Sequence, residues 1–234
     1  MDGWNFDKNE LVMSNGIIPA LYEMVEYICK PDEKVLFLTP SYAYFKYAAD
    51  FNKREYICSD QVYNEGYYTI DFDDFEKKAA EEKTTLFIFC HPHNPSGRIW
   101  REDELKKLAK IIERYHLWVI SDEIHCDLIR LHQKHIPMGK IMPDYQRLIT
   151  AMAPSKTFNL AGMMISNLII RDEKILKLAH DTESPIFSYN SEIELSAVVN
   201  LVYLAARDRY HIEREDKAGE GYVDFIFYPE RKGA

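Results

Sequence analysis

The sequence predicts an α/β fold in which helices cover both faces of a mostly parallel sheet, followed by a short α+β tail. Between residues 11 and 152, apolar runs of strand length alternate with segments whose apolar residues recur at helical spacing. A strand, a helix and a second strand in this order form a parallel crossover unit. Polar side chains also gather where the apolar runs end, at the sheet edge where ligands of such folds bind.

The first predicted elements are an extended segment from Leu11 and a helix that follows Gly16. Leu21, Met24 and Ile28 recur at helical spacing after this glycine. Gly16 lets backbone N–H groups approach an anion, and the N-terminus of the helix adds a partial positive charge. The pattern is compatible with a phosphate site and with a plain turn.

The second part of the predicted sheet begins with an apolar strand at residues 34–39. Tyr42 follows its end, where an aromatic ring can stack on a flat heteroaromatic ligand or simply pack in the core. A short strand at residues 54–58 comes next, and residues 63–68 are predicted to form a surface loop. Residues 73–82 predict an amphipathic helix, whose first acidic residues favour the helix dipole.

Two further strands end in polar residues. The buried strand at residues 85–90 leads to Asn94, which a turn with two prolines and a glycine directs from the strand edge into the cavity expected there. Residues 101–115 predict a helix that covers the sheet. The strand that starts at residue 117 has Asp122 at its C-terminal end, and a buried carboxylate there is costly unless it meets a cation.

Lys156 follows the last predicted strand of the sheet, at residues 147–152. Pro154 ends that strand because proline has no N–H to donate. We expect the ammonium group to be poorly solvated at the mouth of a strand, which favours a neutral amine that attacks an aldehyde. A lysine that snorkels from a loop is the alternative interpretation of this stretch alone.

These strand ends together offer the groups that one cofactor type requires. A pyridine aldehyde with a phosphate would use an amine for the aldehyde, a carboxylate for the ring nitrogen and an amide for the ring hydroxyl. Lys156, Asp122 and Asn94 supply these three groups. Tyr42 adds an aromatic ring for stacking, and the turn at Gly16 adds a place for the phosphate.

Five motifs of the sequence resemble those of the fold-type I pyridoxal-phosphate enzymes, the aminotransferase class I and II superfamily. The motifs are Asn15–Leu21, Thr39–Tyr42, His93–Gly97, Ser121–His125 and Ala153–Asn159. Within the superfamily, the chain is similar to the cystathionine β-lyase or C–S lyase branch. The resemblance covers residues 1–178, and it implies a large domain that binds pyridoxal 5′-phosphate (PLP).

The resemblance also implies a role for each site residue. Lys156 would be the catalytic residue, which binds the cofactor aldehyde as a Schiff base and shuttles the substrate's α-proton. Asp122 would keep the pyridine nitrogen protonated, Asn94 would hydrogen-bond the ring hydroxyl, and Tyr42 would stack on the ring. His125 would also belong to the cofactor site, and it stands where many aminotransferases have a tyrosine.

The implied phosphate site is formed by residues from two of the motifs. These residues are Gly16, Ile17, Ile18 and Ser155. Met164 occupies a position where many aminotransferases carry a phosphate-binding arginine. Together with His125, this departure favours the lyase branch.

The implied reaction is an α,β-elimination from a cysteine S-conjugate such as cystathionine, which gives a thiol, pyruvate and ammonia. A PLP-dependent aminotransferase shares the steps up to the carbanion, and a catalytically silent fragment would keep only the fold; both remain alternatives. Such enzymes are generally dimers. We therefore expect a small amino-acid substrate and a second copy of this chain as partners.

Residues 179–234 resemble a different family, the nuclease-like C-terminal domain of bacterial AAA-ATPase-like proteins of the PD-(D/E)XK class. In that class Asp224 would be one metal-binding carboxylate, and a lysine motif should follow it. No such motif follows in the sequence, so we expect no complete metal site. A divergent helix and hairpin is the alternative interpretation of this tail.

The composition is that of a globular protein, with 47% hydrophobic and 29% charged residues among 234. The net charge of −9 argues against nucleic acid as a partner. Cys29, Cys58, Cys90 and Cys126 are far apart, which predicts reduced and mostly buried thiols and no metal ligation. We expect no signal peptide, no membrane span and a cytoplasmic location.

Overall fold

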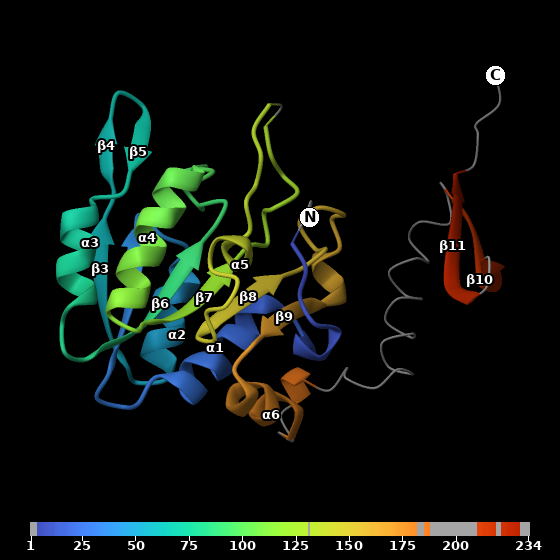
Figure 1. Ribbon diagram of the computed structural model, residues 1–234, viewed down its shortest axis with the longest axis horizontal. Helices are drawn as coiled ribbons and strands as arrows, with labels where there is room; N and C mark the ends of the chain where they lie inside the picture. Colours follow the sequence, from blue (N-terminus) through green and yellow to red (C-terminus); the bar gives the residue numbers. More distant parts are fainter. Residues whose placement is uncertain (1–3, 131, 182–184, 188–209, 219–220, 230–234) are drawn as a thin grey trace. The chain divides into compact units, whose positions relative to one another are not determined.

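A computed structural model describes residues 4–130, 132–181, 185–187, 210–218 and 221–229 (Figure 1). The chain forms two compact units, Met1–Asn190 and Ser191–Ala234. The described part of the second unit is an antiparallel pair of strands, β10 (Tyr210–Ala218) and β11 (Gly221–Pro229). The nuclease-like role of Asp224 concerns a side chain outside the described residues and stays a prediction.

The first unit is built around a seven-stranded sheet with the strand order β1-β9-β8-β7-β6-β2-β3. Its strands are β1 (Leu11–Ser14), β2 (Lys34–Thr39), β3 (Glu55–Asp60), β6 (Thr84–Cys90), β7 (Trp118–Asp122), β8 (Leu148–Met152) and β9 (Ser166–Ile170). The four pairings from β8 to β3 are parallel, whereas β9 runs antiparallel to both β8 and β1. All strands except β9 therefore end at the same edge, and the predicted mostly parallel sheet is confirmed.

Helices cover both faces of this sheet. They are α1 (Ile17–Ile28), α2 (Ala43–Phe51), α3 (Phe72–Ala79), α4 (Glu102–Arg114), α5 (Met138–Ile141) and α6 (Glu173–Asp181), with short 3₁₀ turns η1 (Lys8–Glu10), η2 (Ala161–Met163) and η3 (Pro185–Phe187). The buried hydrophobic side chains of α1, α2 and α6 belong to one core cluster, and those of α3, α4 and α5 belong to a second. The helix predicted after Gly16 and those predicted at residues 73–82 and 101–115 are thus confirmed, and the ends of the last two differ by a few residues.

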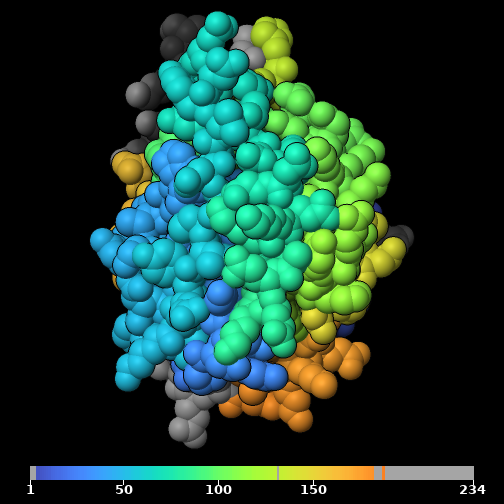
Figure 2. Space-filling view, turned by 90° about the vertical axis from the view of Figure 1, so that its left-hand side faces the viewer, coloured from blue at the N-terminus to red at the C-terminus, as the bar shows by residue number. Residues whose placement is uncertain are grey.

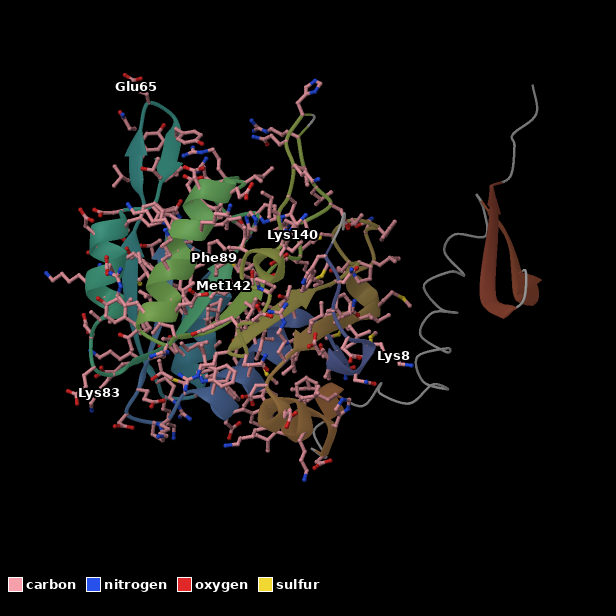
Figure 3. The ribbon with its side chains drawn as sticks, in the orientation of Figure 1. Lys8, Glu65, Lys83, Phe89, Lys140 and Met142 are labelled. Carbon is pink, nitrogen blue, oxygen red and sulfur yellow. The ribbon has the colours of Figure 1, made fainter. Side chains whose placement is uncertain are left out.

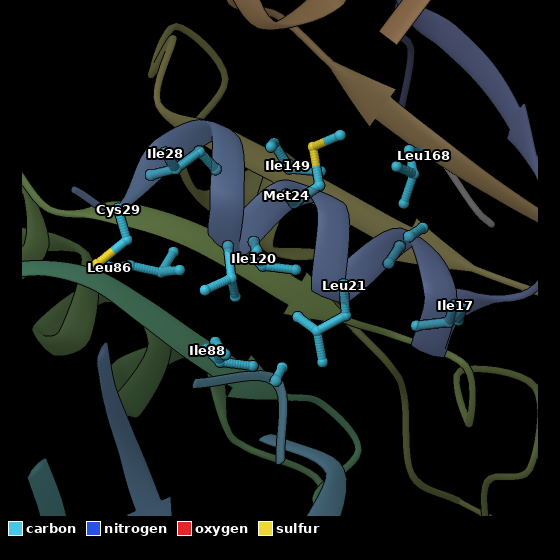
Figure 4. Packing of buried hydrophobic residues seen from close by; sticks show 14 of the residues in the cluster. Ile17, Leu21, Met24, Ile28, Cys29, Leu86, Ile88, Ile120, Ile149 and Leu168 are labelled. Atoms are coloured by element: carbon cyan, nitrogen blue, oxygen red, sulfur yellow. The ribbon is translucent and has the colours of Figure 1, made fainter. Parts of the chain in front are cut away.

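Helix α1 lies along the middle of the sheet and buries one apolar side against it (Figure 4). Leu21 and Met24 point from the helix toward Ile120 of β7 and Ile149 of β8, and all four are at most 3% exposed. Burying an aliphatic side chain of this size contributes about 1.5–3 kcal/mol. This packing fixes the helix so that its N-terminus lies at the edge where the strands end.

The second core cluster is dominated by aromatic side chains between the sheet and helices α3 and α4. Phe87 contacts Phe75 of α3 edge to face, with 4.8 Å between ring centroids. Phe89 and Met142 lie in the interior, between the sheet and its covering helices (Figure 3). Trp100 is 1% exposed and closes the cluster after the turn that carries Asn94.

The segment at residues 63–68, predicted as a loop, is a short β-hairpin, and the prediction was wrong in this respect. Strands β4 (Val62–Asn64) and β5 (Tyr67–Thr69) pair antiparallel, with Glu65 at the protruding tip (Figures 2 and 3). Glu65 and Gly66 both have positive φ angles, 46° and 85°, as a two-residue hairpin turn requires. The polar composition of this segment does not indicate these backbone angles, and for this reason the hairpin was predicted as a loop.

The four cysteines are free thiols, as predicted. Cys29, Cys90 and Cys126 are buried, whereas Cys58 is only half-buried because it lies on the outer strand β3. In the part of the chain that the structure describes, no helix combines the length and the apolar character needed to cross a bilayer.

Candidate active site

A cavity of about 250 Å³ opens at the edge where the strands end. All nine site residues predicted from the sequence line it: Gly16, Ile17, Ile18, Tyr42, Asn94, Asp122, His125, Ser155 and Lys156. They come from five separate stretches, and each stretch begins where β1, β2, β6, β7 or β8 ends. The sheet topology brings them together because strands of one direction share a C-terminal edge.

The N-terminus of α1 forms one wall of the cavity. Gly16 precedes the helix with φ 99° and ψ 152°, a conformation that a residue with a Cβ adopts only under strain. The N-cap residue is this glycine, which has no side chain to cap the helix. The first N–H groups of any α-helix have no partner within the helix, so this end offers donors and a partial positive charge to an anion.

Asp122 ends β7 and is 6% exposed. One carboxylate oxygen, Oδ1, accepts a hydrogen bond of 3.2 Å from the backbone N–H of Ile124. The pKa of Asp122 is raised to about 6, mainly by burial and further by the negative charge of Glu123. The hydrogen bond from Ile124 and the positive charge of Lys156 lower this pKa in part. The carboxylate therefore gains from a cationic partner in the cavity, as the sequence suggested.

Lys156 lines the same cavity from the turn after β8, but its side chain is exposed. The predicted poor solvation of this ammonium group was wrong for this structure. Pro154 ends the strand as expected, and the residues after it form a turn at the rim rather than packing beneath another element. Thr157, the next residue, donates a hydrogen bond of 2.9 Å to Asp127, which ties this turn to the one after β7.

Tyr42 and Asn94 occupy neighbouring strand ends. Tyr42 is half-buried and stacks on Tyr44, with ring centroids 5.1 Å apart and 29° between the planes. Burial, first of all, raises the pKa of its phenol. Asn94 is held by its backbone N–H, which donates to Cys90 Sγ at 3.4 Å, and its position on the cavity wall agrees with the predicted turn.

His125 and Met164 complete the rim that the sequence singled out. His125 is half-buried, and burial together with the positive charge of Lys156 lowers the pKa of its imidazole. A neutral imidazole is therefore the form that faces the amine at neutral pH. Met164 lines the cavity with 55% of its surface exposed, so no cationic side chain comes from this position.

The cavity also contains residues for which sequence reasoning predicted no place in the site. These are Asn15, Pro19, Cys90, Ile124, Ala153, Ala161 and Ile165. Most of them are direct neighbours of predicted site residues in the sequence, and this adjacency is the signal that could have identified them. Cys90 was interpreted only as a buried thiol; its position at the last residue of β6 places it on the cavity wall.

The model of the family "Aminotransferase class I and II" matches residues 2–217. Cystathionine beta-lyase PatB of Bacillus subtilis (strain 168) is 37% identical over 171 residues, which are 73% of this chain and 44% of that protein. The PLP-bound C–S lyase of Staphylococcus hominis, solved with L-cycloserine, superimposes with a TM-score of 0.79 at 44% identity and covers 86% of this chain and 49% of that one. Cystalysin from Treponema denticola, with PLP, gives a TM-score of 0.78 at 33% identity over 87% and 52% of the two chains.

The chain spans about half the length of the relatives it matches. The family match extends past the predicted boundary at residue 178, and the nuclease-like assignment of the segment beyond that boundary stays a prediction. A match over most of the chain, the α/β sheet and the shared structural core agree with one another. The chain belongs to the aminotransferase class I and II family.

Proposed function

We propose that the cavity binds pyridoxal 5′-phosphate and that the chain is part of a PLP-dependent C–S β-lyase. The observation that carries the proposal is that Lys156 and Asp122 face one cavity together with seven other residues from the five motifs. Relatives described as PLP-bound C–S lyase and as cystathionine beta-lyase support it. The cofactor supplies an aldehyde and an electron-accepting ring.

The groups on the cavity wall fit this cofactor. The N-terminus of α1, with a glycine at its N-cap, suits a phosphate, with backbone donors from Gly16, Ile17 and Ile18. Ser155 adds a hydroxyl from the opposite turn. Asp122, buried and with a raised pKa, suits a protonated ring nitrogen, because a shared proton removes the cost of an isolated buried carboxylate.

The chain's own residues then divide the work of the reaction. The Nζ atom of Lys156 accepts the substrate's α-proton, and its exposed position at the rim gives it access to a substrate. Asp122 keeps the ring nitrogen protonated through its buried carboxylate, while Asn94 and Tyr42 orient the flat ligand. His125, kept neutral by burial and by Lys156, presents an imidazole beside the amine.

The proposed substrates are cysteine S-conjugates such as cystathionine, which are cleaved to a thiol, pyruvate and ammonia. His125 and Met164 favour this reaction over transamination, because neither supplies the phenol or the guanidinium that many aminotransferases have at these positions. An aminotransferase is the second candidate function, because the matching family model describes aminotransferases. We also propose a cytoplasmic location, with support from the free thiols.

The first test uses the full chain incubated with PLP. We expect a yellow protein that borohydride bleaches, with the reduced cofactor attached to the peptide that contains Lys156 when the digest is examined by mass spectrometry. Pyruvate release from cystathionine without added 2-oxo acid is then expected. Attachment of the cofactor to another residue, or no attachment, contradicts the cofactor proposal. Amino transfer to a 2-oxo acid without pyruvate release would establish the aminotransferase alternative. Attachment of the cofactor without either reaction would establish the catalytically silent alternative.

We propose that the active form is a homodimer. Tyr44, Tyr47 and Phe51 of α2 are 40%, 49% and 71% exposed, and the ring centroids of Tyr44 and Tyr47 are 5.5 Å apart. Exposed apolar side chains that gather in this way are typical of protein–protein contacts. Phe51 also lines a shallow cavity of about 350 Å³, and this cavity shares Ile18 and Pro19 with the active-site cavity. A second copy on this surface would border the active site.

The dimer is tested by sedimentation of the full chain. We expect a dimer, and the substitution Phe51→Glu is expected to raise its dissociation constant roughly tenfold or more, because a charge replaces a large aromatic in the contact. Tyr63→Glu, at 61% exposure on hairpin β4–β5, is the matched control and should leave the dimer intact. A chain that stays monomeric at all concentrations contradicts the proposal.

A further inference from the structure

A buried polar cluster directly follows the cavity residue Asp122. Glu123 is 0% exposed, and its carboxylate has three donors. Oε1 accepts from Ser121 Oγ and from the backbone N–H of Met138, each at 2.9 Å, and Oε2 is 2.8 Å from His135 Nε2. Three donors thus satisfy the oxygens of a carboxylate that is shielded from water.

His91 extends the cluster to the end of β6. Its Nε2 donates to the carbonyl of Ile136 at 3.0 Å, and its ring lies 4.4 Å from that of His135. Burial, and then the neighbouring His135, lowers the pKa of His91 to about 3, so His91 is neutral at physiological pH. The ends of β6 and β7 are thus both tied to the short segment 135–138.

The backbone of Glu123 continues this anchoring toward β8, because its N–H donates to the carbonyl of Ala151 at 2.8 Å. Glu123 therefore fixes the turn after Asp122 at both its main chain and its side chain. We propose that Glu123 is a positioning residue for Asp122, which holds the Asp122 carboxylate in place and adds a second negative charge to the same buried environment. The inference rests on the proposed role of Asp122 toward the ring nitrogen.

The charge of Glu123 acts in one direction on Asp122. The titratable groups that face Asp122 are Glu123, Lys156 from the turn after β8, Cys90 at the end of β6 and Tyr42 before α2. Lys156 favours the ionised carboxylate, whereas Glu123 disfavours it and so favours a proton between Asp122 and a ligand. Removing the charge of Glu123 should therefore lower the pKa of Asp122.

The substitution Glu123→Gln separates the charge from the anchoring. The amide oxygen can keep the donors Ser121 and Met138, which both bind Oε1. The amide NH₂ then faces His135 Nε2, which must become an acceptor by a change of tautomer. Ser121→Ala is the matched control, because it removes one anchoring hydrogen bond and leaves the charge.

The first readout is the stability of the full chain without cofactor between pH 4 and 6. Asp122 is expected to make stability fall as pH rises in this range, because its pKa is raised from 3.8 to about 6. Glu123→Gln should make this fall smaller, and Ser121→Ala should lower stability equally at each pH. The effect of Glu123→Gln on the fall should disappear in an Asp122→Asn background.

The second readout is the affinity for PLP, measured by fluorescence titration at pH 7. Glu123→Gln is expected to weaken binding about tenfold, the size typical of a lost neighbour that orients a site ligand. The stability readout is independent of the cofactor. If no form binds PLP but the pH effect of Glu123→Gln appears, the proposed function fails and the coupling of Glu123 to Asp122 stands.

Two results would overturn the inference. One is a pH dependence that is the same in Glu123→Gln and the unaltered chain, and the other is a difference that persists in the Asp122→Asn background. If Glu123→Gln does not fold, His135→Gln serves instead, because its amide can donate to Glu123 and carries no charge. The part of the pH dependence between pH 4 and 6 that belongs to Asp122, measured as the difference from His135→Gln in the Asp122→Asn background, must then be at least as large as in the unaltered chain, and a smaller part contradicts the inference.

Discussion

Substitution of Lys156 by alanine is expected to abolish the covalent attachment of PLP and to lower pyruvate release by about 10³-fold or more. The amine is both the group that attacks the aldehyde and the base that accepts the α-proton, and loss of a positioned base alone costs about 10²–10⁴-fold. Mass spectrometry after borohydride reduction and a coupled pyruvate assay measure the two effects.

Lys156→Arg and Lys140→Ala are the controls for this prediction. Arginine keeps the positive charge that acts on Asp122 and His125 but cannot act as the nucleophile, so it should lose attachment while it keeps the protein's electrostatics. Lys140 is an exposed lysine on α5, and its removal should change neither readout. Full attachment of PLP in Lys156→Ala would show that another amine is the reactive group.

Asp122→Asn is expected to stabilise the cofactor-free chain at pH 7 while it impairs the cofactor-dependent reaction. Because the folded protein binds a proton at Asp122 more tightly than the unfolded chain does, stability falls as pH rises from 3.8 to about 6. The whole loss, about 3 kcal/mol from the pKa difference, is present above pH 6. Asparagine carries no charge and can still accept the N–H of Ile124, so it avoids this loss.

The measured quantity must be the difference in the free energy of unfolding between Asp122→Asn and the unaltered chain at each pH. The pKa values of the buried His91 and His93 are lowered to about 3 and about 4, so their contributions are complete above pH 6.5 and are lost as pH falls. They oppose the trend of Asp122 in the same range. Urea unfolding of Asp122→Asn and of the unaltered chain at several pH values isolates the Asp122 part, and equal stability of the two at pH 7 would contradict the prediction.

The same substitution should reduce pyruvate release by about 10²-fold or more, since an amide cannot hold the ring nitrogen protonated. Stability that rises while activity falls distinguishes a functional carboxylate from a structural one, because loss of a structural hydrogen bond lowers both. A variant that is less stable at pH 7 and fully active would assign Asp122 a purely structural role.

The fold was predictable because the physical signals are local. The spacing of apolar residues depends on which face of a helix or strand meets water. Examples are the apolar run at residues 85–90 and the helical spacing of Leu21, Met24 and Ile28. The hairpin β4–β5 was missed because its signal is the backbone conformation of Glu65 and Gly66 rather than apolar periodicity.

The site was predictable for a related reason. In a parallel sheet the residue after each strand lies at a common edge, so Asn94 and Asp122 could be grouped from strand order alone. The solvation of Lys156 could not be obtained in this way. Whether a side chain at that edge is covered depends on segments distant in the sequence, and the turn after β8 leaves Lys156 exposed.

By itself, the sequence determined the α/β class, the strands that end at the cavity and the identity of the groups around it. Only the tertiary structure decided that the pKa of the buried Asp122 is raised, that Lys156 is exposed, and that Glu123 anchors the turn through His135. Periodicity is a property of neighbours along the chain, whereas burial and charge coupling arise from residues that folding brings together.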